Sequence, residues 1–199
     1  MRLAEIKLLE EENKFDRLFL DRIGFRDGGN INAQGLNIVS LKGCPDNVNN
    51  LYVQDNLIDS LEFFPKNVQG NISLSGNKIT SFKGLPRLTM GALRIAGNPI
   101  TSFEGCPRDI GGNLNIANTK ITSFHNIHKF INSINGMIYA HCCDLQDSML
   151  GLLKIQGLTS IIIDDSNLSS ILNSFIGTGD LLACQQELID KGFEDFAKL

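Results

Sequence analysis

Long hydrophobic stretches are absent from this chain. No run of 18 apolar residues occurs in its 199 residues, so we expect no membrane-spanning helix. The first residues, MRLAEIKLLEEENK, carry charges where a secretory signal peptide has an uninterrupted apolar segment. We therefore expect the protein to stay in the cytoplasm of the cell that makes it.

An excess of basic residues is also absent. The 18 lysines and arginines are outnumbered by 22 aspartates and glutamates, which gives a formal net charge of −4. A protein that binds nucleic acid through the phosphate backbone needs a basic face. We therefore expect neither a nucleic-acid partner nor, given the missing apolar span, a membrane partner.

Familiar catalytic motifs are missing as well. The chain has no P-loop, no G-x-G-x-x-G after a strand, no G-x-S-x-G and no H-E-x-x-H. Its five cysteines are an odd number, which suits a reducing compartment better than a disulfide framework. The sequence thus predicts a protein that is not an enzyme and has no cofactor.

What the chain does contain is a repeat. Residues 71–91 (NISLSGNKITSFKGLPRLTMG) are nearly repeated at 92–112 (ALRIAGNPITSFEGCPRDIGG). Apolar pairs recur seven times, and their first members are 20, 21, 21, 21, 24 and 23 residues apart. The pairs are Ile31/Ala33, Leu51/Val53, Ile72/Leu74, Leu93/Ile95, Leu114/Ile116, Ile138/Ala140 and Ile161/Ile163. A fixed period of this size indicates a solenoid, in which successive copies stack and their strands pair side by side.

Other rows repeat at the same period. A turn position holds asparagine in the clearest copies, followed two residues later by isoleucine or leucine; a serine and then a large apolar residue come next. We predict that the turn residues bond to the backbone, that the serines form a second hydrogen-bonding ladder, and that the apolar residues form a spine. The turn residues are Asn56, Asn77, Asn98, Thr119, Cys143 and Ser166; the serines are Ser40, Ser60, Ser81, Ser102, Ser123 and Ser170; the spine is Leu41, Leu61, Phe82, Phe103, Phe124 and Ile171.

The pattern L-x-L-x-x-N/C-x-L in these copies resembles the leucine-rich repeat family. The tail of each unit, I-T-S-F-x-G-x-P, is similar to the short repeats of bacterial and bacteriophage members. The resemblance implies an α/β solenoid: a curved stack with a parallel sheet on its concave face and helical caps at both ends. It also implies that the curved face recognises a protein.

We expect one domain over residues 1–199, made of an N-terminal helical cap (1–29), about seven repeats (30–172) and a C-terminal helical cap (173–199). Residues 2–23 carry helical apolar stripes, and Asp180 can cap a helix that begins at residue 181. The outer side of the lean copies has room only for extended or 3₁₀-like chain. In the longer later copies, 124–135 and 147–157 have helical periodicity, with Asp147 as N-cap of the second.

One group of neighbouring residues could in principle bind a metal or supply a nucleophile: His141, Cys142 and Cys143. His125, His128 and Cys184 lie elsewhere in the sequence. Histidine and cysteine are zinc ligands, but the chain has no C-x₂-C pair and Cys143 fills the turn slot of its copy. His125 and His128, which lie in a longer later copy, are expected in solvent. Cys184 lies in an apolar helical stripe, which favours a buried, inert thiol. We expect no metal site, and we rank a cysteine-dependent enzyme as a low alternative.

With the scaffold rows subtracted, the outward positions of the predicted sheet remain. They form an amide-rich, nearly uncharged surface, and its middle column holds both tyrosines of the chain. Tyrosine and arginine dominate the energetics of many interfaces. The predicted partner-binding residues are Tyr52, Arg94, Tyr139, His141, Asn115 and Ser73. The mixed-charge N-terminal helix, within residues 1–14, is the rival surface.

The sequence therefore predicts a non-enzymatic interaction module that binds a protein through its concave sheet. If the bacteriophage likeness holds, the module would act in the host cytoplasm as a binder or inhibitor of a host or defence protein. The alternative is a structural subunit, for example of a virion, that assembles through its sheet edge or its ends.

Overall fold

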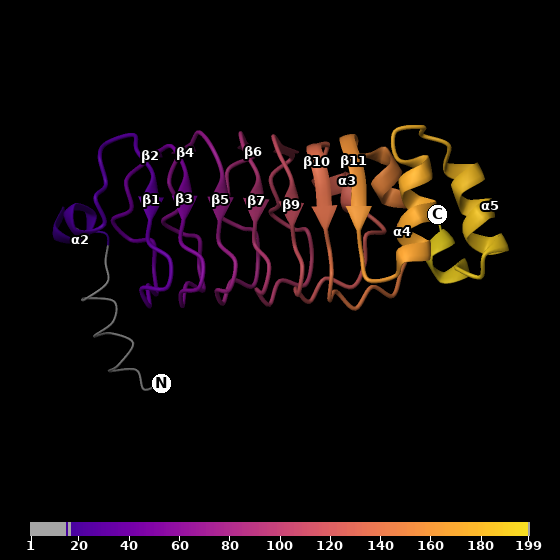
Figure 1. The fold of residues 1–199 in the computed structure, drawn as a ribbon, viewed down its shortest axis with the longest axis horizontal. Helices are drawn as coiled ribbons and strands as arrows, with labels where there is room; N and C mark the ends of the chain where they lie inside the picture. The colour runs from indigo at the N-terminus through magenta and orange to yellow at the C-terminus, as the bar shows by residue number, and fades with distance from the viewer. Residues whose placement is uncertain (1–14, 16, 199) are drawn as a thin grey trace.

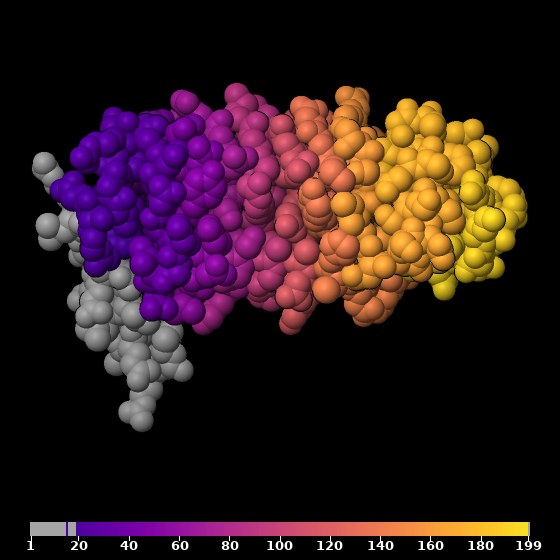
Figure 2. Space-filling view, viewed as in Figure 1, coloured from indigo at the N-terminus to yellow at the C-terminus, as the bar shows by residue number. Residues whose placement is uncertain are grey.

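The chain folds into a parallel-strand β-solenoid of about six turns. The computed structural model describes residues 15 and 17–198. Successive coils follow one another along the long axis, so position along the molecule follows position in the sequence (Figures 1 and 2). The first strand row contains one strand from each coil: β1 (Ile31–Asn32), β3 (Leu51–Tyr52), β5 (Ile72–Ser73), β7 (Leu93–Arg94), β9 (Leu114–Asn115), β10 (Ser133–Tyr139) and β11 (Gln156–Ile162).

A second row of short strands lies on the leg of the coil that leads into the first row. It contains β2 (Asn47–Val48), β4 (Asn67–Val68), β6 (Leu88–Thr89) and β8 (Asp109–Ile110). Strand β2 pairs with β4, and β6 pairs with β8, which pairs in turn with the start of β10. Strands β10 and β11 run through both rows without interruption. The extended outer segment predicted for the lean copies is thus confirmed.

The predicted register of the first row is confirmed in every pair. Ile31 aligns with Leu51, and the same position continues strand by strand as far as Ile161. Inward residues alternate with outward ones because side chains on a strand point to opposite faces. All seven apolar pairs are buried, and thirteen of their fourteen members have no exposed surface. The pairs supply the long core of the solenoid.

The turn asparagines are buried and bind two coils at once. The Nδ2 of Asn77 donates to the carbonyls of Val53 (3.0 Å) and Leu74 (2.9 Å), while its Oδ1 accepts the N–H of Ile58 (3.0 Å). Asn56 and Asn98 repeat this arrangement. In the later coils the turn residue makes fewer hydrogen bonds than these asparagines do.

In the fifth and sixth coils the amide is replaced by smaller groups. The hydroxyl of Thr119 donates to Ile116 (2.8 Å), and the Cys143 thiol lies 3.3 Å from the same carbonyl. Ser166, in the last copy, is exposed and begins a helix, so its predicted place in the ladder is wrong.

A second asparagine ladder runs along the start of the first row, and the sequence argument missed it. The Oδ1 of Asn50 accepts the N–H of Asn71 (2.6 Å), and the Oδ1 of Asn71 accepts the N–H of Ala92 (2.9 Å). Asn113 bonds Met137 in the same way (2.9 Å). A side chain at Gly70 would collide with the amide of Asn50, so glycine leaves the space that this ladder occupies. These asparagines, expected to face a partner, hold the scaffold together.

The serine row does not form a ladder. The Oγ of five of the six serines accepts a backbone N–H two residues ahead in its own coil, as in Ser40 to Lys42 (3.1 Å) and Ser81 to Lys83 (3.1 Å). Ser123 also reaches the next coil, where its hydroxyl donates to Asp147 (3.3 Å). A serine hydroxyl reaches its own turn more easily than the next coil. The apolar spine is confirmed, with the Phe82 and Phe103 rings stacked 6.3 Å apart and Phe103 5.4 Å from Phe124.

Short helical segments precede the second-row part of the strand in the longer coils. They are α3 (Ile127–Phe130) and the 3₁₀ helix η1 (Leu150–Lys154). Asp147 does not cap η1, whose preceding residue is Met149; its carboxylate instead accepts the N–H of Ser148 (2.6 Å). None of the helices within the described residues is both long and apolar enough to cross a membrane.

At the C-terminal end, α4 (Ser166–Phe175) takes the place of a seventh turn (Figure 1). The first strand row therefore ends with β11. The amide of Asn173 in α4 bonds both backbone groups of Ile161 on β11, accepting its N–H (2.7 Å) and donating to its carbonyl (3.0 Å). The helix thus occupies the edge where another strand would pair. Helix α5 (Leu181–Asp190), capped by Asp180 as predicted, and η2 (Glu194–Ala197) follow.

At the N-terminal end, α2 (Arg17–Arg22) is the described part of the helix predicted over residues 2–23. Phe15 and Phe19 are buried, with their rings edge to face 5.0 Å apart, and both pack against the core. Most of the predicted N-terminal cap, and the rival surface in residues 1–14, lie outside the described residues.

We predict that Asn77→Ala lowers the free energy of unfolding by about 2–4 kcal/mol, because it leaves buried backbone groups of two coils without partners. The measurement is urea denaturation followed by circular dichroism. The matched control is Asn67→Ala, since the Asn67 amide bonds only the exposed Asn47 (2.8 Å) and should change stability by less than about 0.5 kcal/mol. Equal losses in the two variants would show that the buried ladder is not a main source of stability.

We predict that Asn173→Ala exposes the β11 edge, lowers the free energy of unfolding by about 1–2 kcal/mol, and promotes concentration-dependent association. Urea denaturation and analytical ultracentrifugation measure the two effects. Asn167→Ala is the control, because Asn167 is an exposed residue of the same helix. A monomeric Asn173→Ala variant of unchanged stability would contradict an edge-covering role for α4.

Candidate functional site

The parallel register brings the predicted middle column into one row on the outward side of the first strand row. Its members, in order along the solenoid, are Asn32, Tyr52, Ser73, Arg94, Asn115, Tyr139 and Ile162. Neighbouring strands are about 4.7–4.9 Å apart. The three large polar residues, Tyr52, Arg94 and Tyr139, occupy every second strand of the row. We call this the sheet-face row.

The two tyrosines and the arginine of the sheet-face row differ in exposure. Tyr52 and Tyr139 are half-buried, whereas Arg94 is exposed. The Tyr139 hydroxyl lies 3.6 Å from the sulfur of Met137, a weak acceptor. The Arg94 guanidinium makes neither a hydrogen bond nor an ion pair within residues 15 and 17–198, so its donors remain available.

Ser73 corrects the predicted site. It is only 7% exposed, because it is a short side chain in register between Tyr52 and Arg94. Asn115 is half-buried, and its Oδ1 already accepts the N–H of Ala117 (3.0 Å). Ser73 is therefore buried within the row, whereas Asn115 is half-buried like the two tyrosines.

His141 lies two residues beyond Tyr139 and pairs with the next coil. Its Nδ1 is 3.3 Å from the Oδ1 of Asp164, whose Oδ2 accepts the N–H of Cys142 (2.7 Å). Both side chains are exposed, so an ion pair here contributes little to stability. The contact ties the His141 side chain to the following coil.

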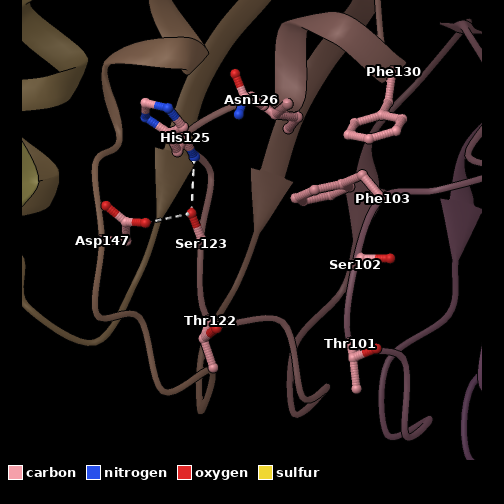
Figure 3. Close-up of a pocket in the computed structure, with 10 residues that line it drawn as sticks. Thr101, Ser102, Phe103, Thr122, Ser123, His125, Asn126, Phe130 and Asp147 are labelled. Atoms are coloured by element: carbon pink, nitrogen blue, oxygen red, sulfur yellow. Dashed lines mark hydrogen bonds between the residues drawn. The ribbon is translucent and has the colours of Figure 1, made fainter. Parts of the chain in front are cut away.

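A pocket that the sequence did not reveal opens on another leg of the coils (Figure 3). Its volume is about 290 Å³, and Phe103 and Phe130 form an apolar wall. Ser123, His125 and Asp147 line it, which raises the question of a catalytic triad.

The arrangement of these three side chains is not that of a triad. The backbone N–H of His125, not its ring, donates to Ser123 Oγ (3.1 Å), and Ser123 contacts Asp147 directly (3.3 Å). A triad instead places the imidazole between the serine and the carboxylate. The contacts seen in Figure 3 shape a turn, and the His125 ring does not bridge the serine and the carboxylate.

The cysteines differ in how far they are exposed to solvent. Cys142 is exposed, Cys143 belongs to the turn ladder, and Cys184 is fully buried. Burial, with Glu187 and Asp180 nearby, raises the pKa of Cys184 to about 11, so little thiolate exists at neutral pH. Within the described residues, no group of three or more His, Cys, Asp and Glu side chains is placed to hold a metal ion.

We predict that iodoacetamide at pH 8 alkylates Cys142 first in the folded protein. Cys106 and Cys184 should react only on unfolding, because both are buried and burial raises the pKa of each thiol. Mass spectrometry of peptides after timed quenching gives the order, and the same reaction in urea is the control. Modification of Cys184 as fast as Cys142 would reveal an activated thiol and revive the cysteine-dependent enzyme.

Comparisons with protein-family models, with curated proteins and with solved structures find no match for this chain.

Proposed function

We propose that this protein is a non-enzymatic binding module that holds a protein partner on its sheet-face row. The observation that supports the proposal is the register, which aligns Tyr52, Arg94 and Tyr139 in one row. The scaffold does not require these side chains, since the same slot holds Asn32 in the first coil. Residues with no part in holding the coils together are available for recognition.

The side chains of this row suit a protein interface. Tyrosine buries a large rigid ring and keeps a polar hydroxyl, and arginine offers several donors. Because both tyrosines are already half-buried against the sheet, they lose less conformational freedom on binding than fully exposed side chains would. The short residues between them leave space for protruding groups of a partner.

The leucine-rich repeat identity is part of the same proposal. It is supported by the L-x-L-x-x-N pattern, the parallel first row and the buried turn asparagines. The outer side departs from an α/β form, because the lean coils carry short strands there and only α3 and η1 are helical among the later coils. A bacteriophage origin, with a host or defence protein as target, is proposed from the repeat tail alone.

The test replaces Tyr52, Arg94, Tyr139 and His141 with alanine together. We predict that binding to the native partner weakens by at least about tenfold, since two or more anchors of an interface are lost. The partner is first found by placing a photo-crosslinking phenylalanine analogue at Tyr52 or Tyr139 in the source cell and identifying the adduct by mass spectrometry.

The control carries four alanines at exposed positions outside the sheet-face row: Asp59, Lys78, Thr80 and Lys120. This variant should bind like the unmodified protein. In the otherwise unmodified protein, the analogue placed at Lys78 should give no adduct. Unchanged affinity of the sheet-face variant, with an unaltered unfolding midpoint, would refute binding at this row.

A further inference from the structure

Two adjoining pockets on the outer side of the solenoid are lined by basic residues. The first has a volume of about 320 Å³ and the second about 270 Å³, and Lys129 lines both. No carboxylate lies among the described residues that line either pocket. The cations around them, which we call the basic strip, are Lys83, Arg87, Arg108, Lys129, Lys154 and Lys198. The strip thus concentrates positive charge on a chain whose net charge is −4.

Most of this charge has no partner. Lys198 pairs with Asp195 (2.9 Å) at an exposed position. The other five cations make no side-chain hydrogen bond and no ion pair in the described part of the chain. Their donors are therefore free to bind an external anion.

The repeat supplies an internal comparison. The slot just before each second-row strand holds Asp46, Lys66, Arg87 and Arg108 in consecutive coils. In the first two coils the charges neutralise each other, with Lys66 Nζ 2.6 Å from Asp46 Oδ2. In the next two coils both slots hold arginine, and their backbones adjoin, since the N–H of Arg108 donates to the carbonyl of Arg87 (2.7 Å). Adjacent like charges are unfavourable to the isolated fold and favour an anion that bridges them.

His128, in the second pocket, gives a separate indication. Its Nδ1 is buried and has no hydrogen-bond partner among the residues that the structure describes. Burial lowers the pKa of His128, and Lys154, Lys129 and His125 lower it further. The influence of these neighbours reflects the basic groups that gather around the pocket.

From these contacts we infer that the basic strip is a docking site for an acidic, carboxylate-rich segment of a protein, with carboxylates held in the two pockets. Arginine binds carboxylates through paired parallel hydrogen bonds, which suits Arg87 and Arg108. Single-stranded nucleic acid is favoured less, because it needs a series of large stacking rings and Phe130 is the one Phe, Tyr or Trp that lines these two pockets within the described residues. The strip is on a different leg of the coil from the sheet-face row, so the proposal goes beyond the function proposed above.

The test measures fluorescence anisotropy of a labelled deca-glutamate peptide with the full chain at low salt. We predict saturable binding, no binding of deca-glutamine, and loss of about tenfold or more in affinity for both Arg87→Glu/Arg108→Glu and Lys129→Glu/Lys154→Glu. If a glutamate variant fails to fold by circular dichroism, the glutamine variants at the same positions replace it, with a loss of at least about threefold expected.

The matched control is Lys78→Glu/Lys120→Glu, which changes the net charge by the same amount at exposed positions outside both pockets. It should weaken binding by no more than about twofold. An equal loss in the control would show a general charge effect and overturn the site, as would an absence of deca-glutamate binding. Tighter binding of a ten-nucleotide single strand than of deca-glutamate would also overturn it, in favour of a nucleic-acid surface. The sheet-face variant should bind deca-glutamate normally, which separates the two proposals.

Discussion

The rest of the structure depends on how each turn asparagine joins one coil to the next. A short turn leaves backbone carbonyls and N–H groups in the core without strand partners, and such groups are costly to bury. The Asn77 amide satisfies groups of its own coil and of the preceding one, and Asn56 and Asn98 do the same. Because an amide both donates and accepts, one residue type can complete the turn and set the register together. Where it is replaced by Thr119 and Cys143, fewer bonds cross the core, and the coils become longer and gain helical segments.

A fixed register has a direct consequence for binding. Every outward position of one coil is aligned with the same position of the next, so the surface consists of rows with known spacing. Side chains in a row that hold no neighbouring coil can vary without cost to the fold. Tyr52, Arg94 and Tyr139 stand in such a row, whereas Asn50 and Asn71, which look equally free in the sequence, are bound to the backbone of the following coil.

Much of the fold follows from the sequence because period and alternation are enough to place an inward residue. The apolar pairs, the spine and the turn asparagines were all predictable on that basis. The hydrogen-bond partners of short polar side chains were not, because the repeat pattern is the same whether a side chain bonds its own turn, as Ser81 does, or the next coil, as Asn71 does. The burial of Ser73 could not be predicted for a related reason. It depends on the size of the neighbours of Ser73 in the row, Tyr52 and Arg94, which the pattern of a single strand does not show. The basic pockets combine residues from coils more than twenty positions apart, which no local motif reveals.

In a molecule built of near-identical coils, each slot can be compared with itself. The slot of Asp46 and Lys66 shows that this backbone position accepts a charge-neutral pair, so the arginines that follow it are not imposed by the coil. The same reasoning applies to the tyrosines, whose slot also accepts Asn32. Departures from the repeat that the scaffold neither needs nor compensates point to something outside it. In this chain they gather on two separate legs of the coil, a polar aromatic row on the first-row sheet and a basic strip on the outer side. Because the two surfaces are separate, a single partner would have to wrap around the solenoid to contact both. Two different partners would have room to bind at the same time.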